Sequence, residues 1–379
     1  MKVLFSSCII HVCIGMIYAY SVLVNPMMDF TEWSKVFVSS VFSVIIVCLG
    51  VSASQVHKLI PHFGTQHVCS AAAIMFMVSF MVMTMALNIP SQAVMIIASI
   101  LLGLSVGALY SIPVPLVMKS FQNKKAIASG LCIMSFGIGS LIASNILQYV
   151  LDKIGNLPST VLLVGIVYGA IILVFSTQLP NTHNTNHECD SSIFKSFTFM
   201  TIFAFFFINI SLGIALLSMI SPMMQTMFDY SPAKAAYFVG IVGLCNGLGR
   251  LLWSFIAERT KDALGTYQVM FVIQLVALFL LGTSSSIFAY WMGILIIISV
   301  YGGGFAIMPS LLATIYEQDK LQYIFGNMLL AWGLAGIFGP ITMSIAQEYC
   351  ASMQHIFLYA TPLIAIAIAL VYANKKRRN

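Results

Sequence analysis

Twelve long apolar runs follow one another along the chain, separated by clusters of Pro, Asn, Asp, Lys or Gly. Each run can cross a bilayer as one helix, because about 20 apolar residues span the hydrocarbon core. Of the 379 residues, 60% are apolar and only 7% are charged. These features predict an all-α polytopic membrane protein with twelve transmembrane helices and exclude a soluble enzyme. The expected spans are 3–25, 36–56, 67–87, 91–118, 125–149, 158–178, 197–227, 232–257, 266–284, 287–316, 321–347 and 353–373.

A polar stretch follows the sixth run. Residues 179–196 are rich in Asn, Thr, His and Ser and cannot bury enough apolar surface to form a core. We therefore expect a six-helix half over 1–178, a short cytoplasmic linker over 179–196 and a second six-helix half over 197–379.

The two halves also resemble each other in sequence. A shift of 196 residues places Pro26, Met27 and Met28 on Pro222, Met223 and Met224, and Gly107, Pro113, Gly130 and Gly137 on Gly303, Pro309, Gly326 and Gly333. Parallel repeats of six spans are typical of transporters that bind substrate near the midplane, between halves that rock to give alternating access.

The basic residues indicate the orientation. With the N-terminus inside, the cytoplasmic loops and tails hold thirteen Lys and Arg residues and the other side holds three. Because short cytoplasmic loops are enriched in Lys and Arg, both termini are expected in the cytoplasm. The membrane is expected to be a bacterial inner membrane or a plasma membrane, and the protein is expected to be a monomer.

Other functional classes find little support. The formal charge of +6 comes mostly from bases scattered between apolar runs, so nucleic-acid binding is not expected. No catalytic triad, metal cluster or nucleotide-binding loop is recognisable, and no enzyme activity, metal or cofactor is expected. The eight cysteines show no spacing typical of metal ligation and are interpreted as packing residues.

Arg250 is the seventeenth base and lies inside the eighth predicted span, whereas all acidic residues fall in loops or at span ends. A charge inside the bilayer requires a partner or a wet cavity, and an anionic small molecule would supply one. Asn246 lies one turn earlier on the same helical face. The alternative is that Arg250 belongs to a cytoplasmic gate near Glu258 to Asp262.

Several other side chains in the spans are candidates for lining a substrate site. His11 and Tyr18 share one face of the first span with Gly15, and His11 is either a proton site or a hydrogen-bonded buried histidine. Tyr110 precedes Pro113 and Pro115, which allow the fourth span to bend. Tyr301 and Trp332 lie beside glycines in the tenth and eleventh spans, where they either contact ligand or pack.

Several segments carry a resemblance to a known family: GMIYAYSVL from Gly15, GLSVGALYSIPVPLVMKSF from Gly103, KKAIASGLCIMSFGIGS from Lys124, NGLGRLLWSFIAE from Asn246, YGGGFAIMPSLLATIY from Tyr301 and FGNMLLAWGLAGIFGP from Phe325. The chain resembles the oxalate/formate antiporter family of the major facilitator superfamily, with the monocarboxylate transporters as close relatives. The resemblance implies the major facilitator fold and transport of small carboxylates. It also implies that Arg250 anchors the anion and that Tyr18, Tyr20 and Tyr110 line the pocket.

The chain departs from that family in three places. Oxalate carriers of this kind add a base in the eleventh span, whereas 321–347 contains no Lys or Arg. Monocarboxylate symporters tend to carry an Asp at the position of Asn246. The loop between the second and third spans, SASQVHKLIPHFG, lacks the acidic residue and the Arg of the superfamily pattern.

The sequence thus predicts a secondary carrier of a small monocarboxylate such as formate, lactate or pyruvate. The alternatives are an oxalate/formate-type dicarboxylate exchanger, a carrier of a non-anionic solute and a sensor that retains the fold without transport.

Overall fold

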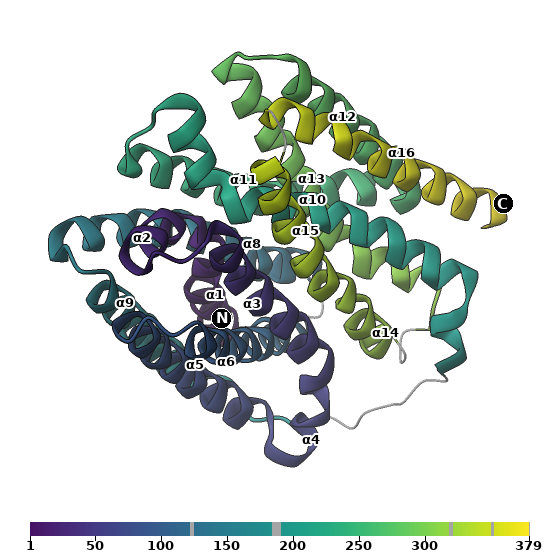
Figure 1. Cartoon of the computed structure of the whole chain (residues 1–379). Coiled ribbons are helices and arrows are strands. Elements are labelled where there is room, and N and C mark those ends of the chain that lie inside the picture. The colour runs from purple at the N-terminus through teal and green to yellow at the C-terminus, as the bar shows by residue number, and fades with distance from the viewer. Residues whose placement is uncertain (122–124, 184–190, 318–320, 350–351, 379) are drawn as a thin grey trace.

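The computed structural model describes residues 1–121, 125–183, 191–317, 321–349 and 352–378 (Figure 1). Within these residues the chain is helical and contains no strand, and 12 helical segments are long and apolar enough to cross a membrane. The all-α class and the twelve predicted spans are thereby confirmed. Residues 184–190 of the predicted linker lie outside the described residues, as do Lys124 and Lys320 of the charge count.

The helices form two successive groups of six spans, seen as the purple-to-blue and teal-to-yellow parts of Figure 1. The first group comprises α1 (Lys2–Ile14) with η1 (Gly15–Ala19), α2 (Ser21–Thr31), α3 (Lys35–Gln55) with η2 (Val56–Lys58), α4 (Ile60–Phe63), α5 (Thr65–Asn88), α6 (Gln92–Ser111), α7 (Pro113–Ser120), α8 (Lys125–Ile154) and α9 (Leu157–Ser176). The second comprises η4 (Ser191–Lys195), α10 (Phe197–Phe228), α11 (Pro232–Thr260), α12 (Ala263–Thr283), α13 (Ile287–Ala313), α14 (Leu321–Met328), α15 (Leu330–Tyr349) and α16 (Met353–Arg378).

Side-chain caps fix the start of several spans. In each of these caps a side-chain oxygen accepts a hydrogen bond from the backbone N–H three residues later; the capping residues are Ser34, Ser91, Asn156, Ser196, Ser231 and Asp262. Such caps satisfy N–H groups that the first helical turn leaves free, and each stabilises its helix by about 1 kcal/mol. The polar clusters that end one apolar run therefore also define where the next helix begins.

Several of the spans are interrupted, and two of these interruptions lie near the contact between the groups or at the prolines. The first predicted span changes to a 3-10 segment at Gly15, where an added Cβ would collide with the backbone carbonyl of Phe136 on α8. The fourth is interrupted at Ile112, between α6 and α7. Because Pro113 and Pro115 lack a backbone N–H, the hydrogen-bond ladder cannot continue unchanged there. The interruption thus lies at the prolines where the sequence predicts a bend.

The helix positions repeat along the chain. Adding 196 to the bounds of α5 gives 261–284, and α12 spans Ala263–Thr283; adding 196 to α6 gives 288–307, and α13 spans Ile287–Ala313. The packing repeats as well, because α5 contacts α6 and α9 just as α12 contacts α13 and α16. The same shift relates the two groups in space as well as in sequence.

Two helix pairs carry most of the contact between the groups: α8 packs along α11, and α3 packs along α15. The repeat exchanges these pairs, which indicates an approximate twofold relation. Glycines allow the close approach in both. A Cβ on Gly137 would lie 2.8 Å from the backbone N of Gly247, and a Cβ on Gly50 would lie 2.8 Å from the backbone N of Gly333.

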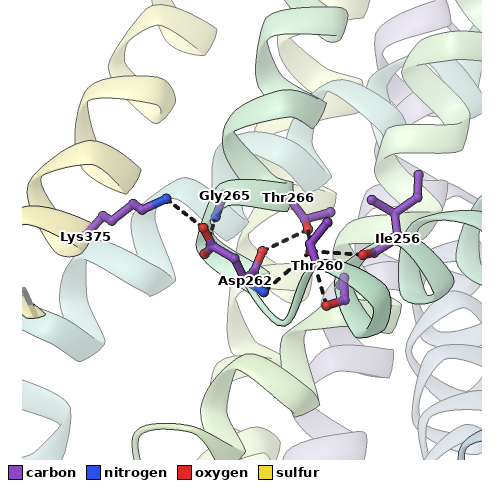
Figure 2. Close-up of polar contacts among 7 residues, drawn as sticks. Ile256, Thr260, Asp262, Gly265, Thr266 and Lys375 are labelled. Carbon is purple, nitrogen blue, oxygen red and sulfur yellow. Dashed lines mark hydrogen bonds and ion pairs between the residues drawn. The ribbon is translucent and has the colours of Figure 1, made fainter.

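At one end of the second group, the loop between α11 and α12 is tied to the end of α16 (Figure 2). Asp262 Oδ1 accepts from the backbone N–H of Gly265 at 2.8 Å, and its Oδ2 pairs with Lys375 Nζ at 2.6 Å. The hydroxyl of Thr266 donates to the Asp262 carbonyl at 2.9 Å. One carboxylate thus caps α12 and holds α16 beside it.

In the first group, hydrogen bonds of uncharged side chains join the segment after α9 to the start of α5 in a corresponding way. Gly64 precedes α5 and offers no capping side chain, and Asn181 Oδ1 instead accepts from the backbone N–H of Gln66 at 3.2 Å. Thr65 donates its hydroxyl to the Pro180 carbonyl at 2.6 Å. The segment that follows α9 is therefore fixed against the start of α5.

Candidate functional site

Arg250 lies on α11 at the contact between the two groups of spans and is only 1% exposed. Its Nη1 donates to the backbone carbonyl of Ile133 on α8 at 3.2 Å and to the hydroxyl of Tyr110 on α6 at 3.5 Å. Its Cζ lies 5.7 Å from the ring centroid of Phe136 and 5.8 Å from that of Phe305. A base from the second half is thus held by residues of both halves.

The remaining donors of Arg250 are unused. Among the described residues, Nε and Nη2 have no hydrogen-bond partner, and the guanidinium has no carboxylate partner. These two N–H groups share one edge of the guanidinium plane, which is the edge that binds a carboxylate through two parallel hydrogen bonds. A buried charge that lacks such partners is costly. The site is therefore complementary to an anion.

Six aromatic rings surround the guanidinium and contact one another. The ring-centroid distances are 4.8 Å for Tyr18 to Phe136, 5.6 Å for Tyr110 to Phe136, 5.2 Å for Tyr110 to Trp332, 4.8 Å for Phe305 to Trp332 and 5.5 Å for Tyr301 to Phe305. All six are at most 6% exposed. We call these six residues the aromatic cluster; four of them, Tyr18, Tyr110, Tyr301 and Trp332, are predicted site residues.

Sequence reasoning missed Phe136 and Phe305. Phe136 carried a usable signal, because adding 196 to its number gives 332, the position of Trp332. Phe305 lies four residues after Tyr301 and one helical turn away on α13. A buried Phe in an apolar span has no distinguishing feature of its own.

A hydrogen bond between two phenols joins the halves within the cluster. The hydroxyl of Tyr18, in η1, is bonded to the hydroxyl of Tyr301, on α13. Because each residue belongs to a different half, this bond links the two groups of spans directly.

Asn246 and Trp332 also present unused polar atoms. Both side-chain atoms of Asn246 and the Nε1 of Trp332 are buried and lack a partner among the described residues. Asn246 precedes Arg250 by one turn of α11, and Trp332 contacts Tyr110 and Phe305 of the cluster. These residues thus add unused polar atoms to the aromatic cluster and to the helical turn before Arg250.

His11 lies at the side of the cluster, with its ring centroid 5.5 Å from that of Tyr110. Its Nδ1 donates to the Ser7 carbonyl at 3.0 Å, and its Nε2 is buried without a partner among the described residues.

Tyr20 is the predicted residue that the structure places elsewhere. Its hydroxyl donates to the Val38 carbonyl at 2.5 Å, and its ring stacks on Phe42 at 5.3 Å. It lines a cavity of about 30 Å³ inside the first half. A larger apolar groove of about 240 Å³ lies between α10, α15 and α16 and is also separate from Arg250.

The proposed gate at the end of α11 is separate from Arg250 in the observed contacts. The partners of Arg250 lie on α6 and α8, whereas Asp262 caps α12 and pairs with Lys375. No group of three or more His, Cys, Asp or Glu side chains suited to a metal ion occurs in the described part of the chain.

Comparison with known protein families and sequences gives consistent results. The model of the Major Facilitator Superfamily matches residues 5–340. An uncharacterized MFS-type transporter of Escherichia coli strain K12, YhjX, is 23% identical over 349 residues, which cover 88% of this chain and 85% of the relative. The oxalate:formate antiporter of Oxalobacter formigenes is 23% identical over 369 residues, which cover 94% of this chain and 87% of the relative.

Solved structures show the same fold. A bacterial homologue of the human lysosomal transporter Spinster, in an inward-facing and occupied conformation, matches with a TM-score of 0.74 at 13% identity and covers 99% of this chain and 96% of that chain. A D-xylose-proton symporter matches with a TM-score of 0.75 at 11% identity over 98% of this chain and 96% of that chain.

Proposed function

Because the chain belongs to the Major Facilitator Superfamily, and is therefore a membrane transporter rather than an enzyme, we propose that it carries a small monocarboxylate such as formate, lactate or pyruvate. In this proposal Arg250 binds the carboxylate, and the two halves rock around it to expose the site to each side of the membrane in turn.

The unused edge of Arg250 carries the proposal. Nη1 is engaged by Ile133 and Tyr110, so the guanidinium is held in place before any ligand arrives. Nε and Nη2 remain free to bind the two carboxylate oxygens. The aromatic cluster around them excludes water, which strengthens a charge-assisted hydrogen bond. The polar atoms of Asn246 and Trp332 are available for a further oxygen, such as a hydroxyl or keto group.

The runner-up is exchange of a dicarboxylate, which the relationship to the oxalate:formate antiporter favours. A dianion requires a second positive charge for its second carboxylate. Residues 321–349, which include α14 and α15, contain no Lys or Arg. With Arg250 as the base in contact with the aromatic cluster, a monoanion matches the site charge better than a dianion.

The wider arrangement is part of the same proposal. The rocking units are residues 1–178 and 197–379, joined by the linker 179–196, and the protein acts as a monomer. The excess of Lys and Arg supports cytoplasmic termini, in a bacterial inner membrane or a plasma membrane.

Counterflow into proteoliposomes tests the proposal. Labelled formate, lactate and oxalate are compared in wild-type protein, Arg250→Ala, Arg250→Lys and the control Arg259→Ala, which removes an exposed Arg at the end of the same helix. We expect monocarboxylate exchange in the wild type and the control, and none with Arg250→Ala. Arg250→Lys keeps the charge but loses one of two parallel hydrogen bonds, so exchange falls about tenfold or more.

Two results contradict the proposal. Wild-type rates with Arg250→Ala would show that the guanidinium does not bind the substrate. Faster exchange of oxalate than of any monocarboxylate would favour the runner-up.

A further inference from the structure

An apolar groove of about 240 Å³ lies between three membrane-spanning helices of the second group, α10, α15 and α16. Ala215, Gly339 and Ile364 line it as buried residues, whereas Phe338 and Leu363 line it with exposed side chains. Because these exposed side chains belong to membrane spans, the groove opens toward the lipid bilayer. Apolar cavities of about 150 Å³ already stay dry and bind apolar guests, so the groove requires a filling other than water.

The groove exists because α15 and α16 are each held by other helices. A Cβ on Gly336 would lie 2.4 Å from Cγ2 of Ile46 on α3, and a Cβ on Gly339 would lie 2.5 Å from a backbone carbonyl oxygen of α10. These close approaches hold α15 between α3 and α10. The start of α16 is bonded instead to the end of α12, where Gln354 Nε2 donates to the Ser284 carbonyl at 3.1 Å. A gap therefore remains between α15 and α16 on the side of the bilayer.

The hydroxyl groups in the groove are satisfied within their own helices. Ser211 donates its hydroxyl to the Phe207 carbonyl at 2.7 Å, and Thr342 donates its hydroxyl to the Gly339 carbonyl at 3.0 Å. None of the residues that line the groove is charged. A polar group placed between these walls would lose its hydrogen bonds to water and gain few in return, which is costly. The part of an occupant that enters the groove is therefore hydrocarbon.

The length and position of the groove match one leaflet of a bilayer. Its walls extend over 338–346 on α15 and 356–364 on α16, which corresponds to about 12 Å at the helical rise per residue. Ala346 lies three residues before the end of α15, and Ile356 lies three residues after the start of α16. The groove thus begins near the membrane surface and extends inward almost as far as one leaflet, which is half of a hydrocarbon core about 30 Å thick.

Polar side chains mark the end of the groove that lies near the membrane surface. His355 directly precedes the groove residue Ile356, and its ring lies 6.4 Å from the ring of Tyr359. The hydroxyl of Ser352 is bonded to Nδ1 of His355 at 3.1 Å. An occupant that is apolar inside the groove and polar at this end is an amphiphile. A transmembrane helix of a second copy does not fit, because a helix with its side chains is at least about 10 Å wide.

We propose that one acyl chain of a membrane phospholipid binds in this groove and stays with the protein, with its headgroup beside His355 and Tyr359. The lipid comes from the leaflet on the side where α15 ends and α16 begins. This inference does not depend on which substrate is transported.

The bound chain would support the contact between the two halves. Phe338 and Thr342 follow Gly336 by two and six residues, which places them on the opposite face of α15. Since Gly336 faces α3 of the first half, a chain in the groove fills the space behind the helix that packs on α3. It also restores dispersion contacts that an empty groove would lose.

Photolabelling from a bilayer tests the proposal. The protein is reconstituted in phosphatidylcholine, a small fraction of which carries a diazirine in one acyl chain, and the labelled peptides are identified by mass spectrometry after illumination. Ala360→Phe and Ala346→Phe fill the groove from α16 and α15. The control Ala71→Phe places the same side chain on an exposed position of α5, outside the groove.

In the wild type and the control, we expect the label to be concentrated in 338–346 and 356–364 relative to the exposed faces of α5 and α12. Each variant with a filled groove should lose this excess and keep the labelling elsewhere. Equal labelling of all exposed faces in the wild type overturns the inference, as does an excess that survives in both filled variants. A groove without label in the wild type would show that another occupant, such as a second copy of the chain, covers it.

A stability measurement keeps the inference testable if neither filled variant folds. In detergent, phosphatidylcholine with long acyl chains should raise the midpoint of thermal unfolding of the wild type, because a ligand that binds only the folded protein stabilises it. Phosphatidylcholine with six-carbon chains, which are shorter than the groove, should raise it less. Equal shifts with both lipids, or no shift with either, overturn the inference and leave the proposed function standing. Loss of carboxylate exchange would overturn the proposed function alone.

Discussion

The guanidinium of Arg250 has two edges with different tasks. Nη1 is bonded to Ile133 and Tyr110 of the first half, whereas Nε and Nη2 have no partner among the described residues. The first set of bonds holds the guanidinium in place, and the proposed function assigns the second set to a carboxylate ligand. On this proposal a fully buried base is both positioned by the protein and available to the substrate.

A substitution at Asn246 tests whether the free edge of Arg250 binds the substrate. Asn246→Asp changes one atom type and places a carboxylate one turn from Arg250 on the same face of α11. We expect the new carboxylate to occupy the free edge, so that monocarboxylate counterflow at pH 7 falls about tenfold or more. Lower pH should restore part of the rate, because a protonated carboxyl releases the guanidinium.

The control is Asn156→Asp, since either side chain can cap α9. Counterflow by Asn246→Asp at the wild-type rate across the pH range would show that the free edge of Arg250 is not the binding surface.

Glycines decide the geometry at the scale of helices. Gly137 on α8 faces Gly243 and Gly247 on α11, and its missing Cβ would lie 2.5 Å from the carbonyl oxygen of Gly243. Ile133 and Phe136, which contact Arg250, lie within one turn of Gly137. The close approach of these two helices therefore also sets the distance between Arg250 and its partners.

Gly137→Ala should separate α8 from α11. Because the opposing atoms are backbone, they cannot rotate away, and overpacking of this kind costs about 1–3 kcal/mol. We expect a lower midpoint of thermal unfolding in detergent and slower counterflow. Gly326→Ala is the matched control, because a Cβ there would be no closer than 3.7 Å to a neighbour.

An unchanged midpoint and rate for Gly137→Ala would mean that the two helices do not need to approach this closely.

The sequence was most informative at the scale of the helices. Apolar runs predict all twelve spans, and Pro113 and Pro115 mark where the helix of the fourth span is interrupted, because both signals act through the local chain. The 3-10 segment at Gly15 was not predicted, because the local chain carries no signal for it; Gly15 packs against the carbonyl of Phe136, which is far away in the sequence.

For the candidate site too, the sequence predicts what depends on the local chain and misses what depends on contacts between distant segments. Arg250 stands out as a base in an apolar run, and Tyr18, Tyr110, Tyr301 and Trp332, which were also predicted, lie around it. Tyr20 follows Tyr18 by two residues and so lies on another face of its segment, where it bonds to Val38.

At the scale of the whole molecule, the aromatic cluster is closed and is built from both halves. Tyr18, Tyr110 and Phe136 come from the first half, and Tyr301, Phe305 and Trp332 from the second. All are buried, so the proposed function requires the halves to separate on one side before a ligand can reach Arg250. The hydrogen bond between Asn25 Nδ2 on α2 and Gln225 Oε1 on α10, at 3.2 Å, joins the halves outside the cluster.

Fixing that contact should stop transport. The double variant Asn25→Cys with Gln225→Cys is treated with a short cross-linker that attaches to both thiols through disulfide bonds. We expect counterflow to fall at least about tenfold, and to recover when a reductant cleaves the disulfides. The two single variants and the wild type, treated in the same way, control for the native cysteines. Full counterflow by the cross-linked protein would be inconsistent with rocking of the halves about this contact.

The sequence repeat relates rings of the aromatic cluster in the two halves, but it gives no second positive charge to match Arg250. Phe136 and Trp332 occupy equivalent positions of the repeat, whereas Asn246 and Arg250 correspond to Gly50 and Ser54. Ser54 carries no charge; its hydroxyl donates to the Val51 carbonyl at 2.8 Å and accepts from Gln55 Nε2 at 3.2 Å. An anion bound to Arg250 would therefore stay attached to the second half during transport. The first half would contribute no charge and would close the site from one side of the membrane or the other.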